Sequence, residues 1–243
     1  RLYLFMKRLL FAVAVATISF GASAQSFAVP LDGFSKKKTS YLHMEDGTVN
    51  EGLLGGFKRA KGQIETVKMK SESGGKIKID PAQIKFMYIP PSNLAKMGAA
   101  LDRVYDVNKW DAPSNMDSTL MGDGYVYFEK MTTQIKKKKT EDLMLQMLNA
   151  SFSSKIKVFY DPFAKETMGV SVGGVNVVGG LDKSYYVHKV GSTDPAFKLE
   201  KKNYKEQFAL LFGDCDEFMA KYGDSIKWSD LETHIYEYTQ MCE

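Results

Sequence analysis

Residues 38–90 contain five short runs of strand-forming residues, and the glycine turns between these runs restrict the segment to a small antiparallel sheet. Asp46-Gly47 separates the first two runs and predicts a type I′ hairpin turn, because that turn needs positive φ at both central positions. Ile77 and Ile79 alternate with lysines, which predicts one buried face on the fourth strand. We expect a small β-barrel or rolled sheet built from residues 39–45, 48–57, 63–70, 76–80 and 84–89.

The sequence after this sheet suggests a break between two units. Pro90-Pro91 ends the last strand, and apolar residues at helical spacing predict a helix over residues 93–108. Residues 111–124 are rich in Asp, Ser, Asn and Gly and predict a loop. We therefore expect a first unit of β-barrel plus helix over residues 25–110 and a second unit over residues 125–243.

The second unit is predicted to be an antiparallel sheet followed by a helical cap. Extended patterns cover residues 125–134, 155–160, 167–178 and 183–190. Residues 141–150 suit either a strand or a helix, and we favour a strand. Three capping boxes mark helix starts near the C-terminus, at Asn203 with Glu206, Asp214 with Glu217, and Ser229 with Glu232. The fold class expected for the whole chain is α+β.

Residues 1–24 have the pattern of a secretory signal peptide. Met6-Lys7-Arg8 supplies positive charge, residues 9–20 are apolar, and Ala22-Ser23-Ala24 fits a signal peptidase site before Gln25. The apolar run is shorter than the roughly 20 residues that cross a bilayer. We therefore expect cleavage, no transmembrane helix afterwards, and an extracytoplasmic location in the periplasm or at the surface of a Gram-negative bacterium.

The two cysteines, Cys215 and Cys242, should form a disulfide in such an oxidising compartment. A bridge that closes a loop of this size contributes about 3 kcal/mol in loop-closure models. We expect the bridge to cover a cluster of apolar side chains from the C-terminal helices, namely Phe208, Leu211, Phe212, Phe218, Leu231, Ile235 and Tyr238.

The charge balance argues against nucleic acid as a partner. Removing the leader takes away three basic residues and no acidic ones, so the formal net charge falls from +4 to +1. A duplex-binding domain normally carries a concentrated basic face. The lysine runs at 36–38 and 136–139 are better explained as solvated loops or as strand ends that block edge pairing.

One catalytic motif is present, a Gly-x-Ser-x-Gly sequence at residues 169–173 that contains Ser171. In α/β-hydrolases this serine lies on a turn from strand to helix, with an acid and a histidine later in the chain. His234 would be that histidine, with Asp194 or Asp214 as the acid. The residues after Ser171 are β-branched and glycine-rich, so we favour a β-hairpin and keep a serine hydrolase as the alternative.

No other pattern indicates a cofactor. His43, His188 and His234 are far apart in the sequence and lack the spacing of metal ligands, and no phosphate-binding glycine loop is present. Tyr185, Tyr186 and Tyr236 could line a binding groove, because tyrosine combines an apolar ring with a hydrogen-bonding hydroxyl. Packing within the sheet and helices is the explanation that we favour for them.

Two resemblances accompany these patterns. Residues 145–149, 155–160, 183–187, 212–215 and 238–242 give the second unit a likeness to exported proteins of unknown function from Gram-negative, Bacteroidetes-like bacteria. Asn149-Ala150 departs from the Asn-Pro usual in those proteins. The strand rhythm of the first unit resembles SH3-like and Sm-like barrels. The first resemblance implies an extracytoplasmic location and no known activity.

Together these patterns predict a binding or structural protein of the periplasm or cell surface. Its expected partner is a small ligand or an envelope protein, and no cofactor is expected. A subunit of a cell-envelope assembly is a second alternative beside the hydrolase.

Overall fold

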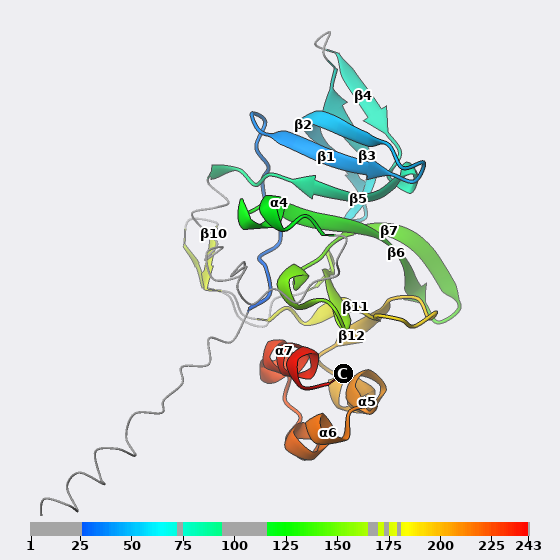
Figure 1. Ribbon diagram of the computed structural model, residues 1–243, viewed down its shortest axis with the longest axis vertical. Coiled ribbons are helices and arrows are strands. Elements are labelled where there is room, and N and C mark those ends of the chain that lie inside the picture. The colour runs from blue at the N-terminus through cyan, green and yellow to red at the C-terminus, as the bar shows by residue number, and fades with distance from the viewer. Residues whose placement is uncertain are drawn as a thin grey trace, which may run out of the picture.

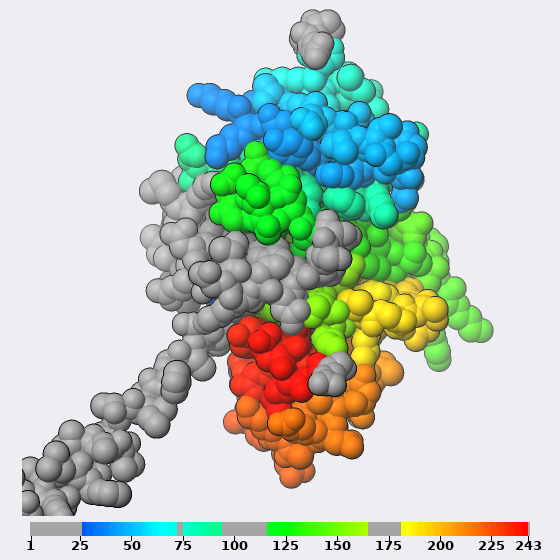
Figure 2. Space-filling view, in the orientation of Figure 1, coloured from blue at the N-terminus to red at the C-terminus, as the bar shows by residue number. Residues whose placement is uncertain are grey.

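The computed structural model describes residues 26–71, 75–93, 116–164, 170–172, 175–178 and 181–242. The predicted leader and nearly all of the helix predicted over residues 93–108 lie outside these ranges. The described chain stacks as a curled sheet, a smaller sheet and a layer of short helices, from the top to the bottom of Figure 1. Figure 2 shows the same succession on the molecular surface. The structure is mostly antiparallel sheet with short C-terminal helices, which agrees with the α+β prediction.

The large sheet has seven antiparallel strands in the order β4-β3-β2-β1-β5-β6-β7. It crosses the predicted boundary at residues 111–124, because β6 pairs with β5 and extends the first sheet instead of starting a second unit. The strand expected within residues 141–150 is present as β7. The strands are β1 (Thr39–Met44), β2 (Val49–Ala60), β3 (Gln63–Lys70), β4 (Lys76–Ile79), β5 (Ile84–Ile89), β6 (Val126–Lys136) and β7 (Lys139–Gln146).

Two local predictions in this sheet are corrected. Only Gly47 of the Asp46-Gly47 pair has positive φ, at 85°, so the turn is not type I′. Its N–H donates to the carbonyl of Met44, which places the turn one residue earlier than expected. Ile79 is buried, but Ile77 is 53% exposed because β4 is the edge strand and extends past the core.

The smaller sheet lies beneath the large one and has the order β12-β11-β8. Its strands are β8 (Ile156–Tyr160), β11 (Ser184–Lys189) and β12 (Phe197–Glu200). The strand β12 was not predicted. An ion pair joins the two sheets, since the Lys157 Nζ donates to both Glu129 carboxylate oxygens at 2.7 and 2.9 Å. A separate hairpin consists of β9 (Val170–Val172) and β10 (Val175–Val178).

A short helix, α4 (Ser118–Gly122), lies in the stretch that was predicted to be a loop. The Asp117 carboxylate starts it by accepting from the backbone N–H groups of Thr119 and Leu120. Tyr88 fixes the approach to this helix, because its hydroxyl accepts from the Asp117 N–H at 2.7 Å.

The C-terminal helices are α5 (Tyr204–Phe212), α6 (Asp216–Tyr222) and α7 (Leu231–Met241). All three begin within two residues of the predicted starts, but the predicted capping boxes do not form. The Asn203 side chain accepts from the Glu200 N–H, outside the helix. Cys215, not Asp214, is the cap residue of α6. Other partners therefore replace the reciprocal bonds that the sequence spacing predicts.

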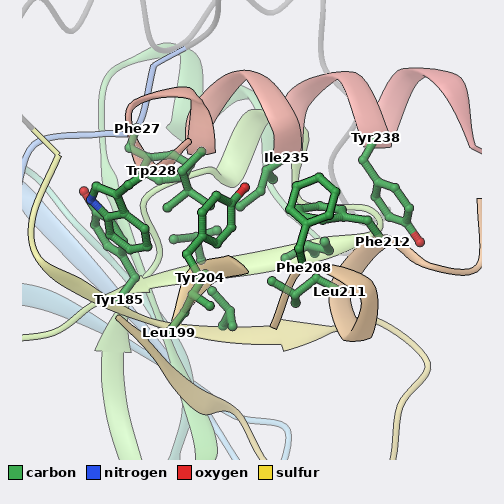
Figure 3. Close-up of a cluster of buried hydrophobic side chains, with 14 of the residues drawn as sticks. Phe27, Tyr185, Leu199, Tyr204, Phe208, Leu211, Phe212, Trp228, Ile235 and Tyr238 are labelled. Carbon is green, nitrogen blue, oxygen red and sulfur yellow. The ribbon is translucent and has the colours of Figure 1, made fainter. Parts of the chain in front are cut away.

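A core between the C-terminal helices and the smaller sheet holds the aromatic cluster shown in Figure 3. All seven residues predicted to pack together are buried in it, so that prediction is confirmed. We call this group the C-terminal core, defined by Phe27, Leu148, Phe152, Ile156, Val158, Tyr185, Val187, Leu199, Tyr204, Phe208, Leu211, Phe212, Phe218, Trp228, Leu231, Ile235 and Tyr238. Two further clusters fill the curled sheet and the space between the sheets.

A disulfide joins Cys215 to Cys242, as predicted, with the Cα atoms 5.8 Å apart. Both cysteines pack against the C-terminal core. Asp214, next to the bridge, accepts from the Tyr238 hydroxyl and the Lys189 ammonium, each at 2.7 Å. The bridge thus ties the start of α6 to the end of α7.

The segment of residues 26–35 runs along all three layers and is held by backbone hydrogen bonds. The Phe27 N–H donates to the Glu232 carboxylate of α7 at 2.8 Å, and Phe27 packs in the C-terminal core. Gln146 accepts from the Leu31 N–H and donates to the Val29 carbonyl. We call residues 26–35 the N-terminal strap.

Candidate ligand-binding pocket

Ser171 lies in strand β9, opposite Asn176 of β10. A nucleophile elbow needs a helix directly after the serine. Here a second strand follows, which is the hairpin context that the sequence favoured.

His234 lies in α7 and is fully buried. Its Nδ1 is hydrogen-bonded to the Tyr204 hydroxyl at 2.6 Å, and the rings of Phe208, Phe218 and Tyr222 surround it. Within the described ranges its Nε2 has no hydrogen-bond partner. Burial lowers the pKa of His234, and the smaller effects of Asp230 and Glu237 oppose that shift. This histidine is therefore neutral and packs against the C-terminal core.

The lowered pKa of His234 predicts a loss of stability in mild acid. In the unfolded chain His234 has a pKa of about 6.5. Below that pH the unfolded state therefore binds a proton that the folded state does not bind. The free energy of unfolding should fall as the pH decreases through 6.5. Urea denaturation at pH 7.5, 6.5 and 5.5 measures this dependence. A double variant with His234→Phe and Tyr204→Phe should show a shallower slope, and an unchanged slope would contradict the assignment.

The three candidate tyrosines take part in packing. Tyr185 is buried in the C-terminal core, where it stacks on Trp228, and its hydroxyl accepts from the Asp182 N–H. Tyr186 is buried between the two sheets. Tyr236 is half-buried and meets Phe152 edge to face. Tyr185 and Tyr186 are thus enclosed in cores and do not line an open groove.

A pocket with a volume of about 260 Å³ lies where four segments meet. The N-terminal strap, the turn between β2 and β3, strand β7 and the end of β8 each contribute to its walls. Its lining residues are Pro30, Leu31, Asp32, Arg59, Gly62, Gln63, Phe128, Met144, Leu145, Gln146, Tyr160 and Pro162. Both the large sheet and the smaller sheet must be in place for the pocket to exist.

Gly62 sets how closely the β2–β3 turn approaches the end of β8. It has a φ of 73°, and a Cβ at this position would lie 2.9 Å from the Pro162 Cβ. Such a contact is too short for carbon atoms, so a side chain would push the two walls apart. Glycine therefore allows both the turn and the contact that closes this side of the pocket.

Arg59 is the cation of the pocket. Its guanidinium lies over the Phe57 ring, with Cζ 5.5 Å from the ring centroid, and Nη1 donates to the Gly62 carbonyl at 3.1 Å. Desolvation lowers the pKa of Arg59, and Tyr160 opposes that shift, but a guanidinium remains charged. No carboxylate of the described residues is within ion-pair distance of it.

Tyr160 and Asp32 are two further polar residues in the lining of the pocket. Burial raises the pKa of Tyr160, and the nearby Asp182 and Asp32 raise it further, so its hydroxyl is a neutral donor. No described residue is hydrogen-bonded to that hydroxyl, to the Asp32 carboxylate or to the Gln63 amide. Gln146, in contrast, uses its amide to hold the N-terminal strap. The pocket therefore offers one cation, one hydroxyl donor, one anion and the Gln63 amide around apolar walls.

Comparison with known proteins identifies no relative from which the role of this pocket could be inferred. No protein family model, curated protein or solved structure matches the chain. In the described ranges, no group of three or more His, Cys, Asp or Glu side chains could hold a metal ion. No helix among the same residues has the length and apolar character to span a membrane.

The sequence contains no pattern that indicates this pocket. Its polar members come from positions 32, 59, 63 and 160, which share no motif or spacing. The only local signal was the turn glycine, Gly62, between two predicted strands. That signal predicts a hairpin, and it does not reveal what the hairpin approaches.

Proposed function

We propose that the protein is an exported binding protein of the Gram-negative cell envelope, and that the pocket around Arg59 is its binding site. The signal-peptide pattern and the disulfide between Cys215 and Cys242 support the extracytoplasmic location. The observation that carries the binding role is a cation in a pocket between two sheets, with no carboxylate of the described residues within ion-pair distance.

The size and composition of the pocket favour binding of a small molecule. Ligand pockets for drug-sized molecules usually have volumes of roughly 300 to 1,000 Å³, with mostly apolar walls and a few polar groups. This pocket, at about 260 Å³, falls just below that range. The ligand should therefore be the size of one amino-acid side chain or a short acid, and not an oligosaccharide.

A pocket-filling variant tests the proposed site. Gln63 is half-buried on the pocket wall, so Gln63→Trp should occupy the space and leave the cores intact. Protein purified from the periplasm, with an N-terminus expected at Gln25, would be titrated with a panel of small organic acids, amides and amines by heteronuclear NMR. We expect saturable shifts at pocket residues in the wild type and their loss in Gln63→Trp.

The matched control is Lys70→Trp, which adds the same ring to the exposed far end of the same strand. It should bind like the wild type. Binding that survives in Gln63→Trp, or shifts that map elsewhere on the molecule, would rule out this pocket as the site.

A further inference from the structure

We infer that the pocket selects small monocarboxylates with an apolar body, an inference that rests on the proposed binding function. The carboxylate would lie between the Arg59 guanidinium and the Tyr160 hydroxyl. Arginine presents a planar fork of donors that matches a carboxylate, and a charge-assisted hydrogen bond is about twice as strong as a neutral one. Both residues line the same pocket, and each influences the pKa of the other.

The chemical state of both groups favours an anion. Arg59 is held in place by the Phe57 ring and the Gly62 carbonyl, so little ordering of its side chain is needed on binding. Tyr160 is protonated at neutral pH, as tyrosine ordinarily is, and burial and nearby acids raise its pKa further, so its hydroxyl can donate to an incoming oxygen. Neither group has a competing acceptor side chain among the described residues.

Asp32 disfavours ligands with more than one negative charge. Its carboxylate lines the same pocket as Tyr160 and contributes to the raised pKa of that tyrosine. Asp32 and Arg59 form no ion pair. A dicarboxylate or a phosphate dianion would meet about twice the repulsion from Asp32 that a monocarboxylate meets, because the Coulomb energy scales with the charge of the ligand.

The rest of the pocket is apolar and would hold a hydrocarbon body. Leu31, Phe128, Met144, Leu145 and Pro162 line it. Each buried methylene contributes about 0.8 kcal/mol, which corresponds to a threefold to fourfold gain in affinity. Affinity should therefore rise along the series from acetate to pentanoate and then stop rising once the volume is filled.

The experiment is a calorimetric or NMR titration of the full mature protein with isovalerate, isovaleramide, glutarate and inorganic phosphate. Isovaleramide has the shape of isovalerate without its charge. We expect isovalerate to bind with a Kd on the order of 1 mM. Isovaleramide, glutarate and phosphate should each bind at least about tenfold more weakly.

Three variants assign the roles of the residues. Arg59→Gln should weaken isovalerate at least about tenfold and leave isovaleramide unchanged, and Tyr160→Phe should weaken isovalerate about fivefold. Asp32→Asn should improve glutarate binding relative to isovalerate. Thermal denaturation of each variant shows whether it is folded.

The outcomes separate the ligand class from the binding function. Equal binding of isovalerate and isovaleramide, or an Arg59→Gln variant that binds isovalerate as the wild type does, would overturn the carboxylate assignment. If another compound of the panel binds and Gln63→Trp blocks it, the binding function stands while the ligand class fails. If isovalerate does not bind, the monocarboxylate inference is wrong.

Discussion

Replacing Phe208 by alanine should lower the free energy of unfolding by about 3 to 5 kcal/mol. Phe208 is about 1% exposed, and its ring contacts those of Tyr204, Phe212 and Phe218 in the C-terminal core. Alanine removes most of this buried surface and leaves a cavity, because the surrounding rings relax only partly. Urea denaturation followed by circular dichroism measures the change.

The same helix provides the control. Leu210 lies in α5 two residues from Phe208 and is 64% exposed. Leu210→Ala changes a similarly apolar side chain without opening a cavity, so the free energy of unfolding should stay within about 0.5 kcal/mol of the wild type. If the two variants lost the same stability, α5 would not pack as described.

Removing the disulfide should lower the free energy of unfolding by about 3 to 4 kcal/mol. Cys215 and Cys242 are 27 residues apart, and the bridge restricts the unfolded chain over that distance. A double variant with both cysteines changed to serine measures the effect. Hydrogen exchange should show α7 losing protection before the strands of the large sheet, because the bridge anchors the end of that helix.

Chemical reduction gives an independent check on this prediction. A reductant should bring the wild type to the stability of the double variant and should not affect the double variant itself. A loss below about 1 kcal/mol in both experiments would show that the core, and not the bridge, determines the stability of this end.

Local patterns predicted the elements well where a single segment determines them. Glycine turns and alternation predicted β1, β3 and β5 closely, and helical spacing identified the side chains that α5, α6 and α7 bury. The pairing of β5 with β6 was not predicted, because the sequence of a strand does not indicate which distant strand it pairs with. Through this pairing one sheet continues across the boundary predicted at residues 111–124.

Predictions about individual side chains were less accurate, because tertiary contacts compete with local ones. Glu232 was expected to complete a capping box with Ser229, but its carboxylate binds the Phe27 N–H across the molecule. The pocket was not predicted either, because it too depends on tertiary contacts. Arg59 and Tyr160 have no local signal, and only the meeting of two sheets makes them neighbours.

The N-terminal strap has a consequence for the order in which the chain can assemble. Ribosomes make Phe27 early, yet its N–H partner, Glu232, is 205 residues further along the sequence. The start of the strap at Phe27 cannot make its native contact until nearly all of the chain has been made. A polypeptide that has to cross a membrane unfolded gains from such an arrangement, since its leading segment stays without its final contacts until the trailing helix arrives.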